Sequence, residues 1–252
     1  MSAEQYYSQI SDILARIHGT QGKLLQQAGQ TIATAIGSGK RVYLFGSGHS
    51  VIPVMDVFPR YGSFVGFFPL YDPRLMWTNV IGPGGARELL WLEQQEGYIE
   101  KFLQSYPFVP GDVLIAFSHG GLNAAAIEAA LYVKARGAQV ITVSSLANAS
   151  IRKAKHSSGK KLPDVADIAI DNCVEPEDAQ VEVGQPEKIA AASTIAAVFI
   201  AMSLVAESGA QLANRGKVPP TFVSPNVPGI EPDHNQKVFE RFTEAFFSRN
   251  HR

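Results

Sequence analysis

The chain has 252 residues, of which 46% are hydrophobic and 18% are charged, and its formal net charge is −1. This length is enough for one large α/β domain or two small ones. The nearly neutral charge gives no electrostatic reason to expect nucleic acid or an anionic membrane as a partner. No stretch has the ~18 uninterrupted apolar residues that span a bilayer. The single cysteine, Cys173, excludes an internal disulfide, and residues 1–5 lack a signal-peptide pattern, so we expect a cytoplasmic protein.

The first 37 residues predict a helical segment. Apolar residues recur at helical spacing over residues 3–37, which indicates one long helix or two helices divided near Gly19 and Gly22. Because this segment precedes the first strand, it has no crossover role between strands. We expect it to pack across the domain or on another subunit.

Five short segments rich in β-branched and aromatic residues predict strands. They are residues 41–45, 63–70, 113–117, 139–144 and 168–171. Helical patterns alternate with them, at residues 50–60, 86–106, 124–136 and in a lysine-rich helix and loop at 145–162. This alternation predicts a doubly wound, mostly parallel sheet, in which ligands bind at the carboxyl ends of the strands. The connection at 71–84 has a length that is often functional.

The last third of the chain is predicted to be mainly helical. Residues 186–213 are rich in alanine and apolar around most of the helix circumference, which predicts a buried helix or one at a subunit interface. Residues 219–229 contain several prolines and are predicted to be extended. A final helix is predicted at 236–247.

A turn of small residues follows the first predicted strand, and we call it the first loop. It consists of Gly46, Ser47, Gly48, His49 and Ser50. Glycines let the backbone approach a ligand closely, a helix N-terminus presents unpaired N–H groups, and serine hydroxyls add donors. The first loop therefore predicts an anion-binding site, and the expected ligand is a phosphate monoester.

The predicted strand at 113–117 is followed by a similar turn, the second loop. It consists of Ser118, His119, Gly120, Gly121, Leu122 and Asn123. Two such loops in one sheet can converge on one ligand, although the glycines can also serve only to turn the chain. Other nucleotide motifs do not fit, because Val51 stands where a dinucleotide site needs its third glycine and no Gly-Lys-Ser/Thr is present. A serine hydrolase elbow is also absent.

The order of these elements and the two loops resemble the SIS (sugar isomerase) domain family. The second loop is similar to the family's Ser-x-Ser-Gly-x-Thr loop, from which it departs at Gly120 and Asn123. Over residues 5–248 the chain resembles an uncharacterised bacterial subgroup of stand-alone SIS proteins. The further features that carry this resemblance are Asp171-Asn172, residues 192–194, residues 222–229 and His234-Asn235.

The resemblance implies a single SIS domain over residues 1–252, folded as a three-layer αβα sandwich with a mostly parallel five-stranded sheet. Its parts would be an extra N-terminal helical segment (1–37), the sheet and its helices (38–213) and a C-terminal extended segment and helix (214–252). The resemblance also implies a homodimer or homotetramer that binds a phosphorylated sugar, and no cofactor is expected.

The resemblance assigns roles to residues of both loops. Ser47, Ser50 and the backbone of Gly48 would hold one side of the ligand. The phosphate would be held by Ser118, Gly120, Gly121 and Asn123. Ser193 would approach the sugar, and His49 and His119 are expected as polar ligand contacts.

Isomerisation of a sugar phosphate needs a base that moves a proton between C1 and C2, and a proton donor. A glutamate and a histidine are the usual residues. Glu96 is the first candidate base because a break at Gly97-Tyr98 interrupts its helix, and Glu88 and Glu187 are alternatives; each can also be a solvated helix charge. His234 is the candidate histidine, since the family often supplies one before the last helix.

One departure from the family concerns metal. Its heptose-phosphate isomerases carry a glutamate and a metal-binding histidine on the helix after the first loop, whereas residues 54–60 contain neither. The histidines also lack a zinc-binding spacing, so no metal site is predicted. The function classes that stay open are an isomerase, a lyase of the muramic-acid-phosphate etherase kind, and a phosphosugar sensor without catalysis. The N-terminal segment is too short for a DNA-binding module.

Overall fold

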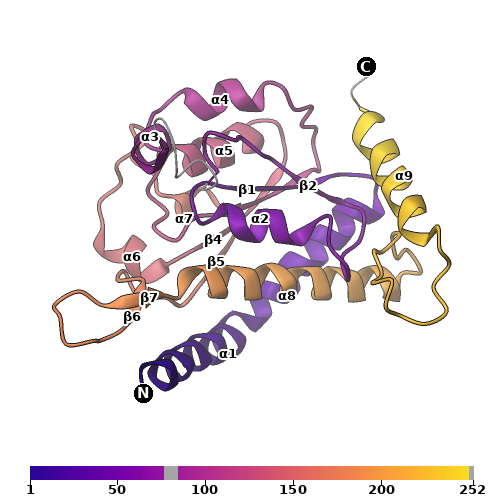
Figure 1. Cartoon of the computed structure of the whole chain (residues 1–252). Helices are drawn as coiled ribbons and strands as arrows, with labels where there is room; N and C mark the ends of the chain where they lie inside the picture. The colour runs from indigo at the N-terminus through magenta and orange to yellow at the C-terminus, as the bar shows by residue number, and fades with distance from the viewer. Residues whose placement is uncertain (77–84, 250–252) are drawn as a thin grey trace.

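A computed structural model describes residues 1–76 and 85–249 as a parallel sheet between layers of helices (Figure 1). The strands are β1 (Val42–Gly46), β2 (Phe67–Pro69), β3 (Val113–Phe117), β4 (Gln139–Ser144) and β5 (Ile168–Asp171). They lie in the order β2-β1-β3-β4-β5, and each neighbouring pair is parallel. The predicted three-layer fold with a five-stranded sheet is therefore confirmed.

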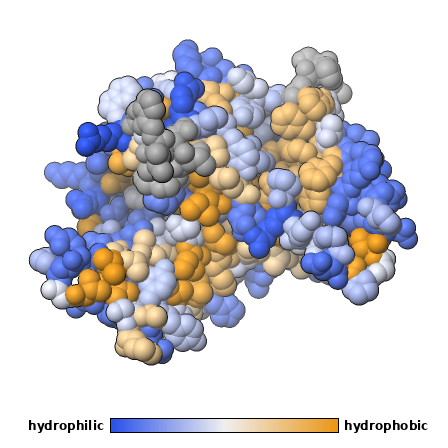
Figure 2. All heavy atoms as spheres, viewed as in Figure 1, coloured by the Kyte–Doolittle hydropathy of each residue, from blue (hydrophilic) through white to orange (hydrophobic). Residues whose placement is uncertain are grey.

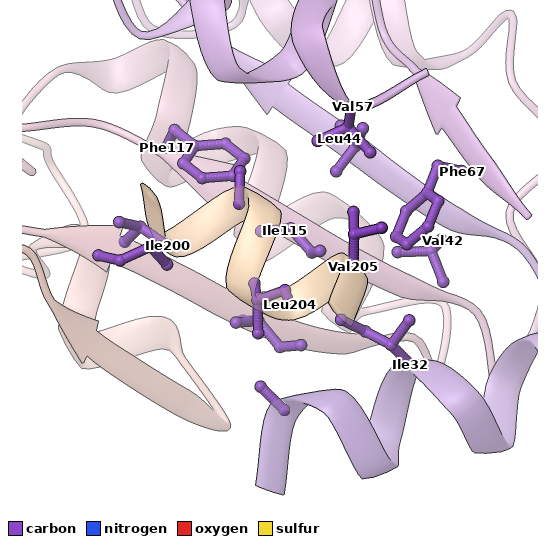
Figure 3. Close-up of a cluster of buried hydrophobic side chains, with 14 of the residues drawn as sticks. Ile32, Val42, Leu44, Val57, Phe67, Ile115, Phe117, Ile200, Leu204 and Val205 are labelled. Atoms are coloured by element: carbon purple, nitrogen blue, oxygen red, sulfur yellow. The ribbon is translucent and has the colours of Figure 1, made fainter. Parts of the chain in front are cut away.

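One face of the sheet is covered by α1 (Ser2–Gly37), α2 (Val51–Val57) and α8 (Ser193–Asn214). Alternate strand residues such as Val42 and Ile115 point to this side. Figure 3 shows them beside Ile200 and Leu204 of α8 and Ile32 of α1. The period-2 alternation of the strands thus decides which side chains these three helices bury.

The opposite face carries the intervening strand residues, including Tyr43 and Leu114. The shorter helices lie in the middle of the chain: α3 (Gly85–Leu92), α4 (Tyr98–Leu103), α5 (Ala124–Lys134), α6 (Leu146–Ile151) and α7 (Leu162–Val165). Of these, α4, α5 and α7 supply most of the apolar side chains that cover this face. The last helix, α9 (His234–Phe247), closes the β2 edge, where the rings of Phe68 and Phe242 lie 5.4 Å apart.

The N-terminal segment forms one helix of 36 residues rather than two. It packs chiefly against α8, which comes from the other end of the chain. The contact is close at Gly29, where an added Cβ would lie 2.6 Å from the Cβ of Glu207. Gly22, on the same helix, has no atom within 4 Å of such a Cβ. Gly29 therefore allows the two helices to approach closely, whereas Gly22 takes no part in this contact.

Two predicted helices differ in the structure. The helix predicted over 86–106 is divided into α3, which ends already at Leu92, and α4; the break expected at Gly97-Tyr98 is found just before α4, where Gly97 adopts a left-handed conformation with φ 83°. The helix predicted over 186–213 begins only at Ser193, since residues before it form the hairpin of β6 (Ala179–Val181) and β7 (Ile189–Ala191). Asp178 Oδ1 accepts hydrogen bonds from the amides of Ala192 and Ser193, which marks the helix start.

Other boundaries shift less. The strand predicted over 63–70 is confined to β2, and the final helix begins at His234 rather than residue 236. Most of the connection predicted at 71–84 lies outside the described residues. In the described part of the chain, α8 alone has the length and composition of a membrane-crossing helix. It is also a core helix here, with nine buried residues.

Exposed apolar side chains gather on the face seen in Figure 2, around α2, the start of α8 and the β6–β7 hairpin. They are Ile52, Met55, Ile195, Val183 and Ile189. Part of this apolar surface belongs to α2 and α8, which also bury the sheet, and part to the β6–β7 hairpin. Helix α8 is thus apolar both toward the core and, near its start, toward solvent, as its composition predicts.

The Gly29 contact gives a test of the α1–α8 packing. Gly29→Ala should destabilise the protein by about 1–3 kcal/mol, because the new methyl group overlaps the backbone-proximal atoms of Glu207. Gly22→Ala, in open space on the same helix, should be neutral or stabilising by up to about 1 kcal/mol. Urea unfolding measures both. Equal effects of the two substitutions would contradict the close contact.

Candidate functional site

The pairing of β1 with β3 brings the two loops to the same edge of the sheet. The strands run parallel, with Gly46 opposite Phe117. The first loop follows the end of β1 and the second loop follows the end of β3. The loops are therefore neighbours at the carboxyl ends of adjacent strands, where ligands of parallel sheets bind.

The first loop folds back tightly on itself before α2 begins. An added Cβ at Gly46 would lie 2.1 Å from the carbonyl oxygen of Ser50, so only glycine fits there. The amide of Ser50 donates to the carbonyl of Ser47 at 3.1 Å, and the amide of Val51 donates to that of Gly48 at 3.2 Å. These bonds fix the turn and direct the loop side chains toward the second loop.

The second loop is held by the elements that follow it. The amide of Ser118 donates to the carbonyl of Val143 on β4 at 3.0 Å. Asn148 of α6 donates to the carbonyl of Gly120 at 2.8 Å. Within the loop, the amide of Gly121 donates to Ser118 Oγ at 3.2 Å, so that hydroxyl keeps its own hydrogen available for another acceptor.

A small pocket lies between the loops. It is lined by both loops, by the residue that follows β5 and by the start of α8. The residues that the sequence singled out and the pocket brings together are His49, Ser50, Ser118, His119 and Ser193. Asn172, which follows β5, completes this polar set. The site thus combines segments that are more than 140 positions apart in the chain.

His119 presents a hydrogen-bond donor at this pocket. Asn172 Oδ1 accepts from the amide of Val174 at 3.0 Å, so its amide nitrogen faces His119 Nδ1 at 3.2 Å. Because Asn172 donates, Nδ1 is the acceptor, and the neutral ring carries its hydrogen on Nε2. His119 Nε2 is buried and has no hydrogen-bond partner within the described residues. A buried donor of this kind is suited to an oxygen of a ligand.

Ser193 is oriented by an aspartate. Asp178 Oδ2 accepts from the Ser193 hydroxyl at 2.7 Å, while Oδ1 accepts from the Ser193 amide. The hydroxyl hydrogen of Ser193 is therefore committed to Asp178. Its oxygen remains able to accept a hydrogen bond at the pocket.

Sequence reasoning did not select Glu93, which joins the two loops. Its carboxylate accepts from Ser47 Oγ at 2.6 Å and from the Asn123 side chain, and the residue is only 7% exposed. Its carbonyl oxygen also accepts from the amide of Ala125 at 3.0 Å. A sequence signal did exist: Glu93 lies four residues after Leu89 and so continues the line of the buried face of α3 one residue beyond the end of the helix.

Burial raises the pKa of the Glu93 carboxyl above its ordinary value of 4.5. Hydrogen bonds from Ser47 and Asn123 act in the opposite direction, but they offset the effect of burial only in part. A carboxyl with a raised pKa is closer to the range in which general bases work best. Buried carboxyls with such shifts are concentrated at functional sites.

The predicted catalytic residues lie elsewhere. Glu96 is exposed and accepts from Ser157, and Glu88 and Glu187 are exposed. His234 Nε2 lies 2.8 Å from the carbonyl oxygen of Thr221 at the start of α9. Glu96, His234 and Glu93 are all absent from the lining of the pocket, but Glu93 alone of the three is hydrogen-bonded to a residue of the first loop, Ser47.

Comparison with known proteins identifies the family. Residues 5–145 match the family model of the SIS domain. A UPF0309 protein of Shouchella clausii is 36% identical over 239 residues, which cover 94% of this chain and 95% of the relative. A UPF0309 protein of Streptomyces coelicolor is 32% identical over 250 residues, 98% and 97% of the two chains. The chain belongs to the SIS domain family.

Solved structures share the fold at low sequence identity. A phosphoheptose isomerase from Neisseria gonorrhoeae superposes with a TM-score of 0.56 at 12% identity, covering 82% of this chain and 97% of that one. The sugar isomerase domain of an RpiR transcription factor from Sphaerobacter thermophilus gives 0.51 at 13% identity, covering 84% and 92%. These similarities concern the fold.

The raised pKa of Glu93 predicts how stability depends on pH. The folded state keeps this proton at pH values above 4.5 where the unfolded state has lost it, so the unfolding free energy falls as pH rises through that window. Glu93→Gln removes the titration, and its stability relative to wild type should therefore increase with pH above 4.5. Urea unfolding at a series of pH values measures this, with the exposed Glu100→Gln as control. A difference that is constant with pH would contradict the prediction.

Proposed function

We propose that the protein is a sugar-phosphate isomerase in which Glu93 is the base. The observation that carries the proposal is the buried Glu93 carboxyl, hydrogen-bonded to Ser47 of the first loop and Asn123 of the second. Burying a carboxyl destabilises the folded state unless the group is paired with other polar groups. Its position between the two proposed anion-binding loops is consistent with a catalytic role that would explain why it is retained.

The phosphate is assigned to the second loop. Ser118 has a free hydroxyl hydrogen because its oxygen accepts from the amide of Gly121. The loop glycines let the phosphate approach the backbone N–H groups closely. The pocket has about 20 Å³ of free volume, room for a water-sized group, so a sugar phosphate must move the side chains around it apart.

The proposed reaction moves two protons. The Glu93 carboxylate takes the proton from the hydroxyl-bearing carbon next to the sugar carbonyl, which forms an enediolate, and returns it to the former carbonyl carbon, while the proton of that hydroxyl passes to the former carbonyl oxygen. The hydrogen bond from Ser47 orients the carboxylate. A donor at the pocket, for which His119 is suited, stabilises the charge that develops on the carbonyl oxygen. Ser47 is thus a positioning residue, and Glu93 replaces Glu96 as the proposed base.

The comparisons support this class of function and its alternative. Phosphoheptose isomerases are among the proteins that share the fold, which favours an isomerase. The sugar isomerase domain of a transcription factor shares it too, which keeps a phosphosugar sensor as the alternative. A lyase would begin with the same proton abstraction by Glu93 and differ in the bond that breaks next.

The first test is a thermal-shift screen against sugar phosphates, amino-sugar phosphates and their unphosphorylated parents. A bound phosphosugar at a hundredfold excess over Kd should add about 3 kcal/mol of stability. The compound that binds is then incubated with protein in D2O and followed by NMR. We expect isomerisation with deuterium incorporation, lowered at least about 100-fold in Glu93→Gln but unchanged in the exposed Glu100→Gln.

The possible results separate the three functions. Conversion that Glu93→Gln abolishes without loss of binding supports the proposal. Binding without conversion would identify a sensor, and an elimination product would identify a lyase; both outcomes overturn the isomerase. A protein that no phosphosugar stabilises would overturn the anion site itself.

The two serines should separate binding from turnover. Ser118→Ala removes a donor to the phosphate and should raise Kd for the phosphosugar at least about tenfold, since a hydrogen bond to a charged group contributes about 1.5–3 kcal/mol. Ser47→Ala leaves the phosphate donors intact and should mainly lower kcat. The exposed Ser105→Ala is the control. Calorimetry and NMR rates measure the two effects, and equal loss of binding in both variants would contradict the separate roles.

A further inference from the structure

Three potential metal ligands meet on the helical side opposite α1. Glu96 lies in the turn before α4, Glu128 is on α5, and His156 is in the segment between α6 and α7. His156 Nε2 is 3.8 Å from Glu96 Oε2 and 3.7 Å from Glu128 Oε1. One ligand atom from each residue lies within 4.8 Å of the other two.

Two polar atoms of this cluster are buried without a partner. The His156 side chain is 7% exposed, and its Nε2 makes no hydrogen bond with the described residues although it points between the two carboxylates. Glu128 Oε2 is also buried and without a hydrogen-bond partner there. Leaving such atoms unsatisfied destabilises the folded state, and a bound cation would offset this cost.

The surrounding groups hold the three side chains in place. Glu96 Oε1 accepts from the amide of Ser157 at 2.7 Å, and Ser157 Oγ donates to Oε2. Glu128 Oε1 accepts from the amide of Gly97 at 2.6 Å. His156 Nδ1 lies 2.8 Å from Ser158 Oγ. Metal ligands are commonly oriented by hydrogen bonds of this kind to their remaining atoms.

We propose that Glu96, Glu128 and His156 bind a divalent metal ion, with Zn²⁺ as the preferred ion. Imidazole nitrogen together with carboxylate oxygens is a zinc ligand set, with distances of about 2.0–2.2 Å. Two ligands of a tetrahedral zinc are then about 3.3 Å apart, so separations of 3.7 and 3.8 Å need only small side-chain shifts. Two carboxylates match the charge of the ion, and three ligands leave one position for water.

The ion would join three segments that are distant in the chain. Helix α5, which carries Glu128, follows the second loop, and Glu96 follows Glu93 by three residues. None of the three ligands lines the pocket between the loops. The metal therefore has a structural role, fixing the elements behind both loops. This placement also differs from the helix after the first loop, where heptose-phosphate isomerases carry their metal ligands.

The test is calorimetry of the full chain, treated with EDTA and dialysed, against ZnCl2, with MnCl2 and MgCl2 as comparisons. We expect one Zn²⁺ per chain and a higher Tm with zinc. Glu96→Gln and His156→Ala should each weaken zinc binding at least about tenfold. Two exposed residues outside the cluster supply the matched controls, His18→Ala and Glu100→Gln, which should bind as wild type does. Visible absorption of bound Co²⁺ reports whether an imidazole and oxygen site is occupied.

Several results would overturn the site. They are the absence of saturable zinc binding, equal affinity in wild type and both ligand variants, and loss of zinc only on His119→Ala, which would place the ion in the pocket. If zinc does not bind and NMR shows His156 protonated, an ion pair between its imidazolium and the two carboxylates replaces the metal. Should His156→Ala fail to fold, Glu96→Gln carries the test, because Glu96 is 39% exposed.

Discussion

The parallel register between β1 and β3 is the constraint on which the site depends. The two strands are separated by more than 60 residues in the chain, yet Gly46 lies opposite Phe117. This single alignment places the first loop beside the second. It also creates the place between them that Glu93 occupies, with Ser47 on one side and Asn123 on the other. A shift of one residue would reverse the faces of the strand and separate the loops.

The buried Glu93 carboxyl shows how stability and chemistry oppose each other at this place. Its burial favours the neutral acid and so weakens the folded state at neutral pH. Two hydrogen bonds reduce this effect without removing it. By contrast, the buried Asp112 carboxylate at the other end of the sheet is fully paired, with Arg249 at 2.8 Å and with the amide of Arg41 at 2.9 Å. The Asp112 carboxylate is thus fully paired within the fold, whereas the Glu93 carboxyl is stabilised only in part.

The local sequence correctly predicted those strands whose formation depends on neighbouring residues. The segments 113–117, 139–144 and 168–171 match β3, β4 and β5 because each is an apolar run bounded by turn residues. The predicted start of α8 was wrong, because the observed start depends on hydrogen bonds to Asp178, which lies outside the predicted helix. The break expected at Gly97-Tyr98 is present, since Gly97 adopts a left-handed conformation just before α4, but the apolar pattern did not predict that α3 ends as early as Leu92.

As with the fold, the parts of the site that depend on local sequence were predictable, and those that depend on long-range packing were not. Glycine and serine after two strands indicate the loops without any structure. Glu93 could have been found from its position four residues after Leu89, but a choice among several glutamates requires knowledge of which one is buried. The cluster of Glu96, Glu128 and His156 has no spacing motif, because its members lie about 30 residues apart and meet only through the packing of three segments. Long-range packing of this kind is invisible to periodicity.

The contact between α1 and α8 has a consequence for biosynthesis. Helix α1 is made first, and its apolar stripe packs on a helix that ends at Asn214. About 180 residues must be added between them, which takes roughly 9–35 s at about 5–20 residues per second. During that time the stripe around Ile17, Leu25 and Ile32 lacks α8, its main native partner, although β1, β3 and β5 are made earlier. The apolar stripe of α1 is therefore completely covered only after α8 has left the ribosome.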